Sequence, residues 1–188
     1  MKRSGKTITL LAKKGGVGKS TLCVLLYEAM RKAGKSAMIH DWDAQGTSTK
    51  ALESFGAPGV QNAAVRIFDT PPSLEHTASA MGVREADIVL VVTSPSPADI
   101  WEANDAVNFA KSKNSNARIR VMFNKVRQYT ILGRLVEESA KGLDAPMLPI
   151  MLSARECYQH AIADGWKALD HAAQDEVLRL TLSLLSFK

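Results

Sequence analysis

A glycine-rich run, residues 15–20, is the first candidate functional segment of this chain and lies between an apolar segment and a helical pattern. Glycines let backbone amides turn inward around phosphate oxygens, and the N-terminal end of the following helix adds positive charge. In such a loop Lys19 would neutralise the β and γ phosphates of a nucleotide, and the Ser20 hydroxyl would ligate Mg²⁺. The run therefore predicts a Mg²⁺-dependent nucleotide site.

Carboxylates follow two apolar, strand-like runs. Asp41 and Asp43 come after one run, and Asp69 ends the next, in the segment Asp-Thr-Pro-Pro-Ser. Ligands bind at the carboxyl ends of parallel strands, and carboxylates there can support Mg²⁺ and its waters. The alternative is that these aspartates only cap loops and turns.

Residues 14–21 read Lys-Gly-Gly-Val-Gly-Lys-Ser-Thr, and Lys13 stands where the usual phosphate-loop pattern has glycine. The segment resembles the deviant Walker A motif, K-G-G-x-x-K-[ST], of the ParA/MinD superfamily. The resemblance implies that Lys14 reaches across a two-fold interface to the partner's nucleotide, in a homodimer formed with ATP. A second positive charge would stabilise the charge that develops on the transferred phosphoryl group. The predicted nucleotide-binding residues are Lys14, Gly15, Gly16, Val17, Gly18, Lys19, Ser20, Thr21 and, later in the chain, Asn124.

The carboxylate segments fit the same resemblance. Residues 41–45, Asp-Trp-Asp-Ala-Gln, are similar to the superfamily's D-x-D-P-Q switch, with Ala44 in place of proline. This implies that Asp43 orients the attacking water and that Asp41 supports Mg²⁺, while Asp69 holds the outer shell of the metal. The predicted catalytic residues are thus Lys14, Lys19 and Asp43, and the predicted metal residues are Ser20, Asp41 and Asp69.

Two later positions match the superfamily near the base of its nucleotide. Asn124 ends a predicted strand, where the family's adenine-facing asparagine often lies; the alternative is a strand-end cap. Residues 153–155, Ser-Ala-Arg, resemble the start of the late loop and helix that close over the base.

Apolar strand-like runs alternate with helical patterns along the 188 residues, of which 46% are hydrophobic. This alternation predicts a single α/β domain, 1–188, with a mainly parallel twisted sheet and helices on both faces. The expected strands are 6–12, 36–41, 64–69, 88–93, 119–124 and a short one at 147–150. The expected helices are 19–33, 47–55, 73–81, 98–111, 129–141, 154–169 and 174–186.

The net charge is +5 and the isoelectric point is near 9.3, which suggests an acidic partner. Seven basic residues and no acidic residue lie between Ala106 and Val136. The ordinary interpretation is a solvated face, but such a run is also a candidate surface for the phosphate backbone of DNA. Arg127, Arg134 and Arg155 are the predicted DNA contacts.

In length and motif order the chain resembles the short ParA-type partition ATPases that lack an N-terminal helix-turn-helix domain. The resemblance implies an Mg²⁺-dependent ATPase that dimerises with ATP and binds DNA without sequence preference. A small DNA-binding or adaptor protein would stimulate hydrolysis, so that a plasmid, chromosome or other cargo is positioned over the bacterial nucleoid in the cytoplasm.

Two alternatives stay open. A MinD-like membrane ATPase would need a basic amphipathic C-terminal helix, but residues 174–188 hold only Arg179 and Lys188 as basic groups, and we expect this helix to pack on the domain. A metabolic enzyme of the same superfold is the other alternative. Cys23 and Cys157 lack the context of an iron–sulfur cluster.

Overall fold

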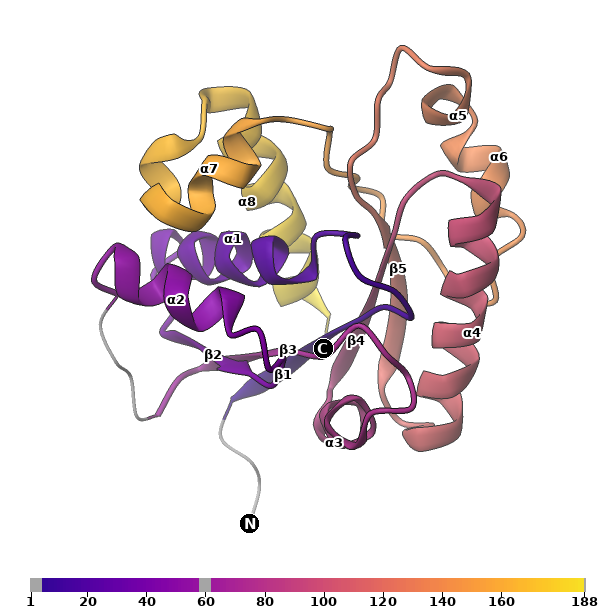
Figure 1. The fold of residues 1–188 in the computed structure, drawn as a ribbon, viewed down its shortest axis with the longest axis horizontal. Coiled ribbons are helices and arrows are strands. Elements are labelled where there is room, and N and C mark those ends of the chain that lie inside the picture. The colour runs from indigo at the N-terminus through magenta and orange to yellow at the C-terminus, as the bar shows by residue number, and fades with distance from the viewer. Residues whose placement is uncertain (1–4, 58–61, 188) are drawn as a thin grey trace.

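Five parallel strands form the middle layer of the molecule in the computed structural model, which describes residues 5–57 and 62–187 (Figure 1). Their order across the sheet is β2-β3-β1-β4-β5. The sheet confirms the predicted α/β class, because the near-continuous apolar runs are strands covered on both faces. The strands are β1 (Lys6–Leu11), β2 (Ala37–Asp41), β3 (Val65–Asp69), β4 (Ile88–Thr93) and β5 (Arg118–Phe123).

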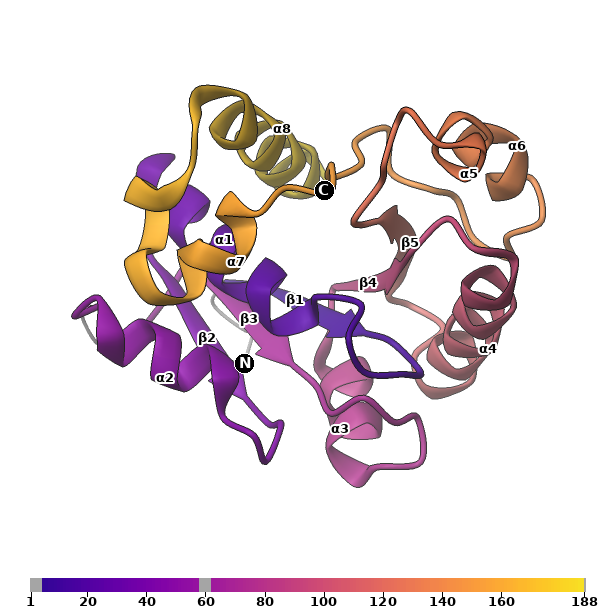
Figure 2. The same cartoon turned by 45° about the horizontal axis from the view of Figure 1, so that its top comes forward.

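Helices cover both faces of this sheet. Figures 1 and 2 show α1, α2, α7 and α8 gathered on one side and α3 and α4 on the other, with α5 and α6 beside the start of α4. The helical elements are α1 (Lys19–Lys32), α2 (Thr47–Ser54), α3 (Thr77–Glu85), α4 (Pro97–Lys113), α5 (Ile131–Arg134), α6 (Val136–Ala140), α7 (Cys157–Asp164), a 3-10 turn (Gly165–Ala168) and α8 (His171–Ser186).

The hydrophobic core has one part on each face of the sheet. On the α1 side, Leu22 and Leu26 of α1 pack in one buried cluster with Leu180 and Leu184 of α8. The buried residues of α8 recur at helical spacing, so the C-terminal helix packs on the domain, as predicted. Burying one such leucine contributes about 1.5–3 kcal/mol. Among the described residues, no helix is long and apolar enough to cross a membrane.

Two helix ends have the residues that such ends favour. Gly34 follows α1 with φ +71°, and the N–H of Lys35 donates to the carbonyl of Met30 at 2.9 Å, which closes the helix with a left-handed cap. Pro97 occupies the first turn of α4, where a missing N–H has no cost, and the Ser96 side chain caps that helix by accepting from the N–H of Asp99.

The short strand predicted at 147–150 is not formed. Met147 makes only an isolated parallel bridge to Val121, and the N–H of Leu148 donates to the Val121 carbonyl at 2.8 Å. Pro146 and Pro149 flank these positions, and proline has no N–H to extend a ladder. The segment therefore runs beside β5 without joining the sheet as a strand.

Three predicted helices have different limits. The helix expected at 73–81 begins at Thr77, because the His76 side chain accepts from the N–H of Ala78 and caps it there. The helix expected at 129–141 is two short helices that meet at Leu135, and the helix expected at 154–169 begins at Cys157 and ends in the 3-10 turn.

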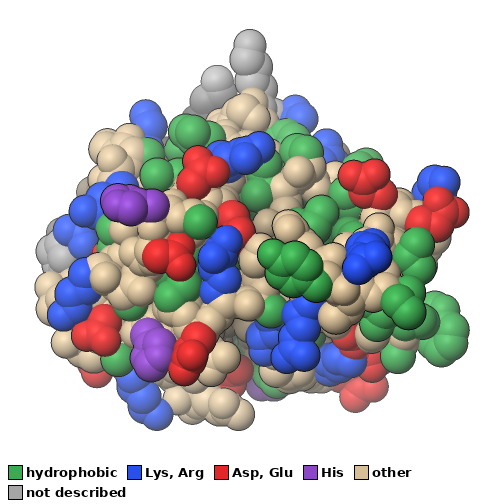
Figure 3. Space-filling model, turned by 90° about the horizontal axis from the view of Figure 1, so that it is seen from above, with side chains coloured by type: hydrophobic (Ala, Val, Ile, Leu, Met, Phe, Trp, Pro, Cys, Tyr) green, Lys and Arg blue, Asp and Glu red, His purple; other side chains and the backbone are tan. Residues whose placement is uncertain are grey.

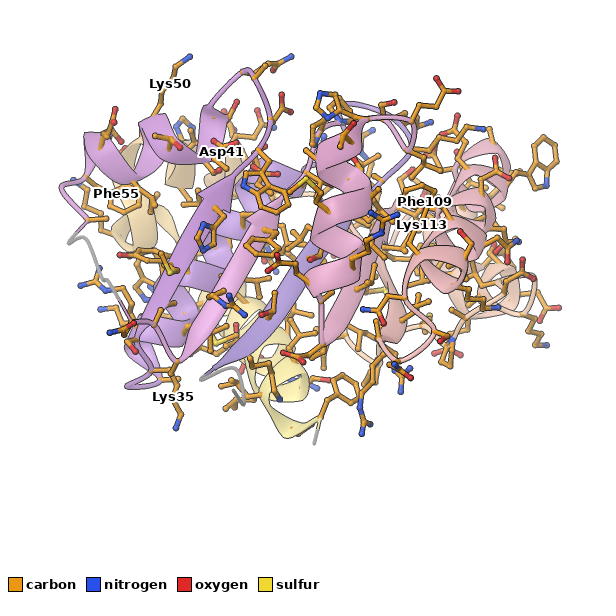
Figure 4. All side chains as sticks on the ribbon, turned by 90° about the horizontal axis from the view of Figure 1, so that it is seen from below. Lys35, Asp41, Lys50, Phe55, Phe109 and Lys113 are labelled. Atoms are coloured by element: carbon orange, nitrogen blue, oxygen red, sulfur yellow. The ribbon has the colours of Figure 1, made fainter. Side chains whose placement is uncertain are left out.

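The carboxyl ends of the strands meet at one edge of the sheet. Asp69 lies opposite Leu10 of β1 and opposite Asp41 of β2 in the parallel register. Figure 4 shows Asp41 beside α2, at one end of the sheet. Lys35, which precedes β2, lies at the opposite end. Side chains from three consecutive strands of the sheet are thereby brought to the same edge.

Candidate functional site

The loop between β1 and α1 forms a cradle of backbone groups. Figure 2 shows it in indigo, reaching toward α3 and α4 before it turns back into α1. Gly16 and Gly18 have φ values of +79° and +94°, a region that favours glycine, and Gly18 is the N-cap of α1 without a side-chain cap. A Cβ on Gly18 would lie 2.5 Å from the Asn124 side-chain nitrogen. The uncapped N-terminus of α1 is suited to bind an anion.

Lys19 and Asp69 are buried beneath this loop. Lys19 is 6% exposed, and desolvation lowers the pKa of its ammonium although Asp69 opposes that effect. Asp69 is fully buried, and desolvation raises the pKa of its carboxyl to about 6. The hydroxyls of Ser20 and Ser48 oppose this rise, yet neither carboxylate oxygen of Asp69 has a hydrogen bond of normal geometry. An unsatisfied buried carboxylate calls for a further partner.

Asp41 and Asp43 form the start of the next loop. The Asp41 carboxylate accepts from the N–H of Asp43 at 3.1 Å and from the N–H of Thr49 at 3.0 Å. Asp43 accepts from the N–H of Gln45 at 3.1 Å. These bonds order the segment at the edge of the sheet and leave the second Asp43 oxygen available to a ligand.

The phosphate loop opens into a cavity of about 380 Å³. Its lining joins the predicted phosphate, metal and water-orienting groups in one space. The lining residues are Gly15, Gly16, Gly18, Lys19, Ser20, Thr21, Asp43, Gln45, Pro72, Lys125 and Gln159.

The predicted metal residues fit Mg²⁺. Ser20 lines the cavity, and Asp41 and Asp69 are paired across β2 and β3 behind it. Mg²⁺ keeps several waters and is bound in such sites by few protein oxygens together with phosphates. The unsatisfied Asp69 oxygens are acceptors for such waters. In the described part of the chain, no group of three or more His, Cys, Asp or Glu side chains could hold a metal by itself.

A second cavity, of about 730 Å³, adjoins the first through Gly18, Thr21 and Lys125. Residues 152–156 line its far side, and Figure 1 shows this segment crossing from the β5 side to α7 on the α1 side. It is large enough for the nucleoside part of a nucleotide. The late loop, residues 153–155, for which the resemblance implies a place over the base, therefore lies beside a cavity of suitable size.

Asn124 is 7% exposed and ties the end of β5 to the phosphate loop. Its side-chain nitrogen donates to the Val17 carbonyl at 2.8 Å, and its side-chain oxygen accepts from the N–H of Lys125 at 2.9 Å. The residue lines the larger cavity as well. It thus caps the strand end, and its contact with adenine stays a prediction.

Arg155 also lines the larger cavity, where acidic side chains neutralise it. Its guanidinium lies 2.9 Å from the Glu176 carboxylate and 3.7 Å from that of Asp170. Glu176 further accepts from the Ser153 side chain at 2.8 Å and from the Tyr158 hydroxyl at 2.7 Å. Glu176 therefore holds the loop 153–158 in place, and Arg155 has less charge free for DNA than the sequence suggested.

Lys14 is turned toward α4 of its own chain. Its ammonium forms ion pairs with Asp99 and with Glu102, the latter at 3.2 Å, and these two carboxylates raise the pKa of Lys14. Lys13 pairs with Asp105 at 2.7 Å. Both partners of Lys14 are in its own chain, and its contact with a partner's nucleotide stays a prediction.

Lys125 belongs to the site but was predicted only as one of the seven basic residues between Ala106 and Val136. Lys125 lines both cavities, and its ammonium donates to the Gly16 carbonyl at 2.6 Å. The one feature of the sequence that could have indicated a role for Lys125 in the site is its position directly after Asn124.

These features define a nucleotide-binding protein of the P-loop class, and comparisons with known proteins agree. The family described as "CobQ/CobB/MinD/ParA nucleotide binding domain" matches residues 8–165. The chain belongs to this family, which confirms the resemblance to the ParA/MinD superfamily.

Individual relatives are distant in sequence. "Maintenance of carboxysome distribution protein A" of Halothiobacillus neapolitanus is 22% identical over 187 residues, covering 86% of this chain and 87% of that protein. The MinD cell division protein of Aquifex aeolicus superposes with a TM-score of 0.79 at 17% identity and covers 98% of both chains. A putative plasmid partition protein from Borrelia burgdorferi, bound to AMPPNP, has a TM-score of 0.74 at 17% identity, with 96% of this chain and 98% of that chain covered. The two structural likenesses support the fold.

Proposed function

We propose that this protein is an Mg²⁺-dependent ATPase that dimerises when it binds ATP and positions a cargo along DNA. The observation that carries the proposal is that Lys19 and the unsatisfied carboxylate of Asp69 are both buried behind a glycine cradle that opens on two joined cavities. One cavity fits a triphosphate and the other a nucleoside.

Each group has a distinct task in hydrolysis. The loop amides and Lys19 bind the phosphates and neutralise charge that develops as the γ-phosphoryl group leaves. Asp43 holds the attacking water in line, because it lines the same cavity and has a free oxygen. Mg²⁺, bound by Ser20 and through waters by Asp41 and Asp69, would supply further positive charge at the phosphates.

Dimerisation requires that Lys14 exchange its partners. In a single chain the ammonium is neutralised by Asp99 and Glu102 on α4. The triphosphate of a second copy presents several anionic oxygens, so it can compete with these two carboxylates for the ammonium. ATP in both subunits would then stabilise the dimer, and loss of the γ-phosphate would weaken it.

The DNA surface that we propose is centred on Arg127 and Arg134. Both are exposed, and neither makes an ion pair with another described residue. On the face seen in Figure 3, basic side chains alternate with acidic ones and do not merge into a continuous basic surface. Weak, salt-dependent binding that gains strength from dimerisation is what such a surface supports.

The carboxysome relative suggests a large protein assembly as the class of cargo, and the plasmid partition protein suggests a replicon. Either cargo would be linked through a small adaptor or DNA-binding protein that stimulates hydrolysis, in a bacterial cytoplasm and over the nucleoid.

The test compares purified protein with Mg²⁺ and either ATP or ADP. We expect ATP to double the mass measured by light scattering and to increase retention on duplex DNA, and we expect slow phosphate release.

Two variants test the assigned residues. Lys19→Ala should abolish the ATP-dependent dimer, the increased DNA retention and the phosphate release. Asp43→Ala should still bind ATP and dimerise but release no phosphate. Normal turnover by Asp43→Ala would exclude the assigned role, and a strictly monomeric protein that retains Mg²⁺-ATP would exclude the dimer mechanism.

A further inference from the structure

Lys125 has an unusual backbone conformation. Its φ of +57° makes it the one non-glycine residue with a positive φ among residues 5–57 and 62–187. This region strains an L-residue with a long side chain, so the surrounding structure must hold it there. The Asn124 side chain accepts from the N–H of Lys125, and the next residue, Val126, donates to the Leu152 carbonyl at 3.0 Å. Such strain is typical of functional sites.

The conformation brings the Lys125 side chain to the phosphate loop. Its ammonium donates to the Gly16 carbonyl at 2.6 Å, across 109 positions of the sequence. Asn124 beside it donates to the Val17 carbonyl at 2.8 Å. Two consecutive side chains at the end of β5 therefore hold two consecutive carbonyls of the loop.

Holding a carbonyl also fixes the direction of an amide. In a planar trans peptide the C=O of one residue and the N–H of the next point in opposite directions. Lys125 therefore sets the direction of the Val17 N–H, and Asn124 sets that of the Gly18 N–H. Neither N–H donates to another group in the described parts of the chain, so both are available to a ligand.

We propose that Lys125 is a nucleotide-positioning residue that keeps the phosphate loop in its binding conformation by fixing the Gly16 carbonyl. The inference rests on the proposed function, because it takes the loop ligand to be a nucleoside di- or triphosphate. Lys125 acts through the loop amides, so its effect falls on the phosphates common to ATP and ADP and not on the identity of the base. A preformed cradle lowers the ordering cost of binding.

The experiment measures dissociation constants of fluorescent ATP, ADP and GTP analogues with Mg²⁺. Lys125→Met keeps the length of the side chain but has no donor, and we expect it to weaken ATP and ADP binding by about 10-fold or more, with an unchanged preference between ATP and GTP. Lys125→Arg keeps a donor and should bind within about 3-fold of the unaltered protein. Lys141→Met, at an exposed lysine that ends α6, is the matched control and should bind normally.

A glycine variant separates the ammonium from the backbone strain. Lys125→Gly relieves the positive φ but has no side chain, so we expect it to bind as weakly as Lys125→Met even if its melting temperature without nucleotide rises. In steady-state turnover by Lys125→Met and Lys125→Gly, the KM for ATP should increase by a larger factor than kcat falls. Lys125→Arg should have a KM close to that of the unaltered protein.

Several results would overturn the inference. Normal affinity in Lys125→Met or in Lys125→Gly would show that the ammonium is dispensable. A loss confined to ATP, with ADP unaffected, would indicate a direct γ-phosphate contact instead of loop positioning. If the unaltered protein bound no nucleotide, the proposed function itself would fail, whereas equal binding by Lys125→Met and the unaltered protein would exclude only the role of Lys125.

Discussion

The backbone N–H of Trp42 donates to the carbonyl of Asp69 at 2.9 Å, which joins the loop that follows β2 to the end of β3. The Trp42 ring stacks on Phe68, with centroids 4.5 Å apart and planes at 20°. A Cβ added to Gly82 of α3 would lie 3.5 Å from this ring. Trp42 stands between Asp41 and Asp43, so its anchoring positions both carboxylates.

We expect Trp42→Ala to slow hydrolysis more than it weakens ATP binding. The substitution removes the stack that positions Asp43 but leaves Lys19 and the phosphate loop unchanged. Phe68 is buried and Trp42 is half-buried, and a stacked pair of this kind contributes about 1–3 kcal/mol, so urea unfolding should show a loss of that size. Steady-state kinetics should show a reduced kcat with a KM for ATP that changes little, and Trp42→Phe should retain most of the activity.

A second substitution separates positioning from general damage. The N–H of Gly46 donates to the Asp43 carbonyl at 2.9 Å, which makes Ala44 the second residue of a four-residue turn, where proline is favoured. Ala44→Pro should stiffen this turn and recover part of the kcat lost in Trp42→Ala. If Trp42→Ala had a normal kcat, or lost ATP affinity in proportion to kcat, the anchoring role would be excluded.

Lys14→Ala should bind ATP but lose the ATP-dependent dimer. The ammonium lies outside the cavity in the single chain, paired with Asp99 and Glu102, so its removal costs the single-chain site little. Light scattering with ATP should show a monomer, while nucleotide titration should show near-normal affinity. Glu102→Gln weakens the competing ion pair and should shift dimerisation to lower protein concentration. Dimerisation that is unchanged in Lys14→Ala would exclude the trans role.

The strand ends and the phosphate loop could be predicted from sequence because they depend on local pattern. Continuous apolar runs mark buried parallel strands, and the strand predicted at 88–93 has the bounds of β4. Glycines before Lys19 mark a loop that needs positive φ. Asp41 and Asp69 could be placed at one edge because parallel strands end together.

Long-range pairings could not be predicted in the same way. The bond of Lys125 to Gly16 joins positions 109 residues apart and depends on a left-handed backbone that lysine rarely adopts. Glu176 neutralises Arg155 across 21 positions, so the charge of that arginine could not be judged from the sequence. The strand at 147–150 was predicted from its apolar composition. It does not form, because Pro146 and Pro149 have no N–H to donate to a neighbouring strand.

Replacing both Arg127 and Arg134 with alanine should weaken retention on duplex DNA in the ATP state. For every arginine–phosphate interaction that the substitutions remove, the slope of log affinity against log salt should fall by about one unit. Arg179→Ala is the control, because Arg179 is exposed on α8 beside Asp175 and its replacement changes the net charge without touching the proposed surface. Equal DNA affinity in the double variant would place the DNA surface elsewhere. Because the control removes one positive charge and the double variant removes two, a weakening in the control of about half that in the double variant would indicate a general charge effect.

Asp69 should make nucleotide-free stability depend on pH. Its pKa is raised from 3.8 to about 6 because it is buried, so the folded protein binds a proton more tightly than the unfolded chain does. The folded state is therefore favoured by this group below about pH 4, loses that advantage as the pH rises from about 4 to 6, and has the full penalty above pH 6. The shift corresponds to about 3 kcal/mol, which urea unfolding across this range should detect.

Mg²⁺-ATP should reverse this trend, because waters of a bound Mg²⁺ would donate to the ionised carboxylate of Asp69. The rise in melting temperature caused by Mg²⁺-ATP should increase as the pH rises through about 6, where Asp69 loses its proton. Asp69→Asn keeps the shape of the side chain without a titrating group, so its nucleotide-free stability should vary less between pH 4 and 7 and should exceed that of the unaltered protein at pH 7. The nucleotide's own protonation is common to both proteins, so the difference between them isolates Asp69. An Asp69→Asn variant with an unchanged pH profile and full stabilisation by Mg²⁺-ATP would show that Asp69 neither titrates in this range nor supports the metal.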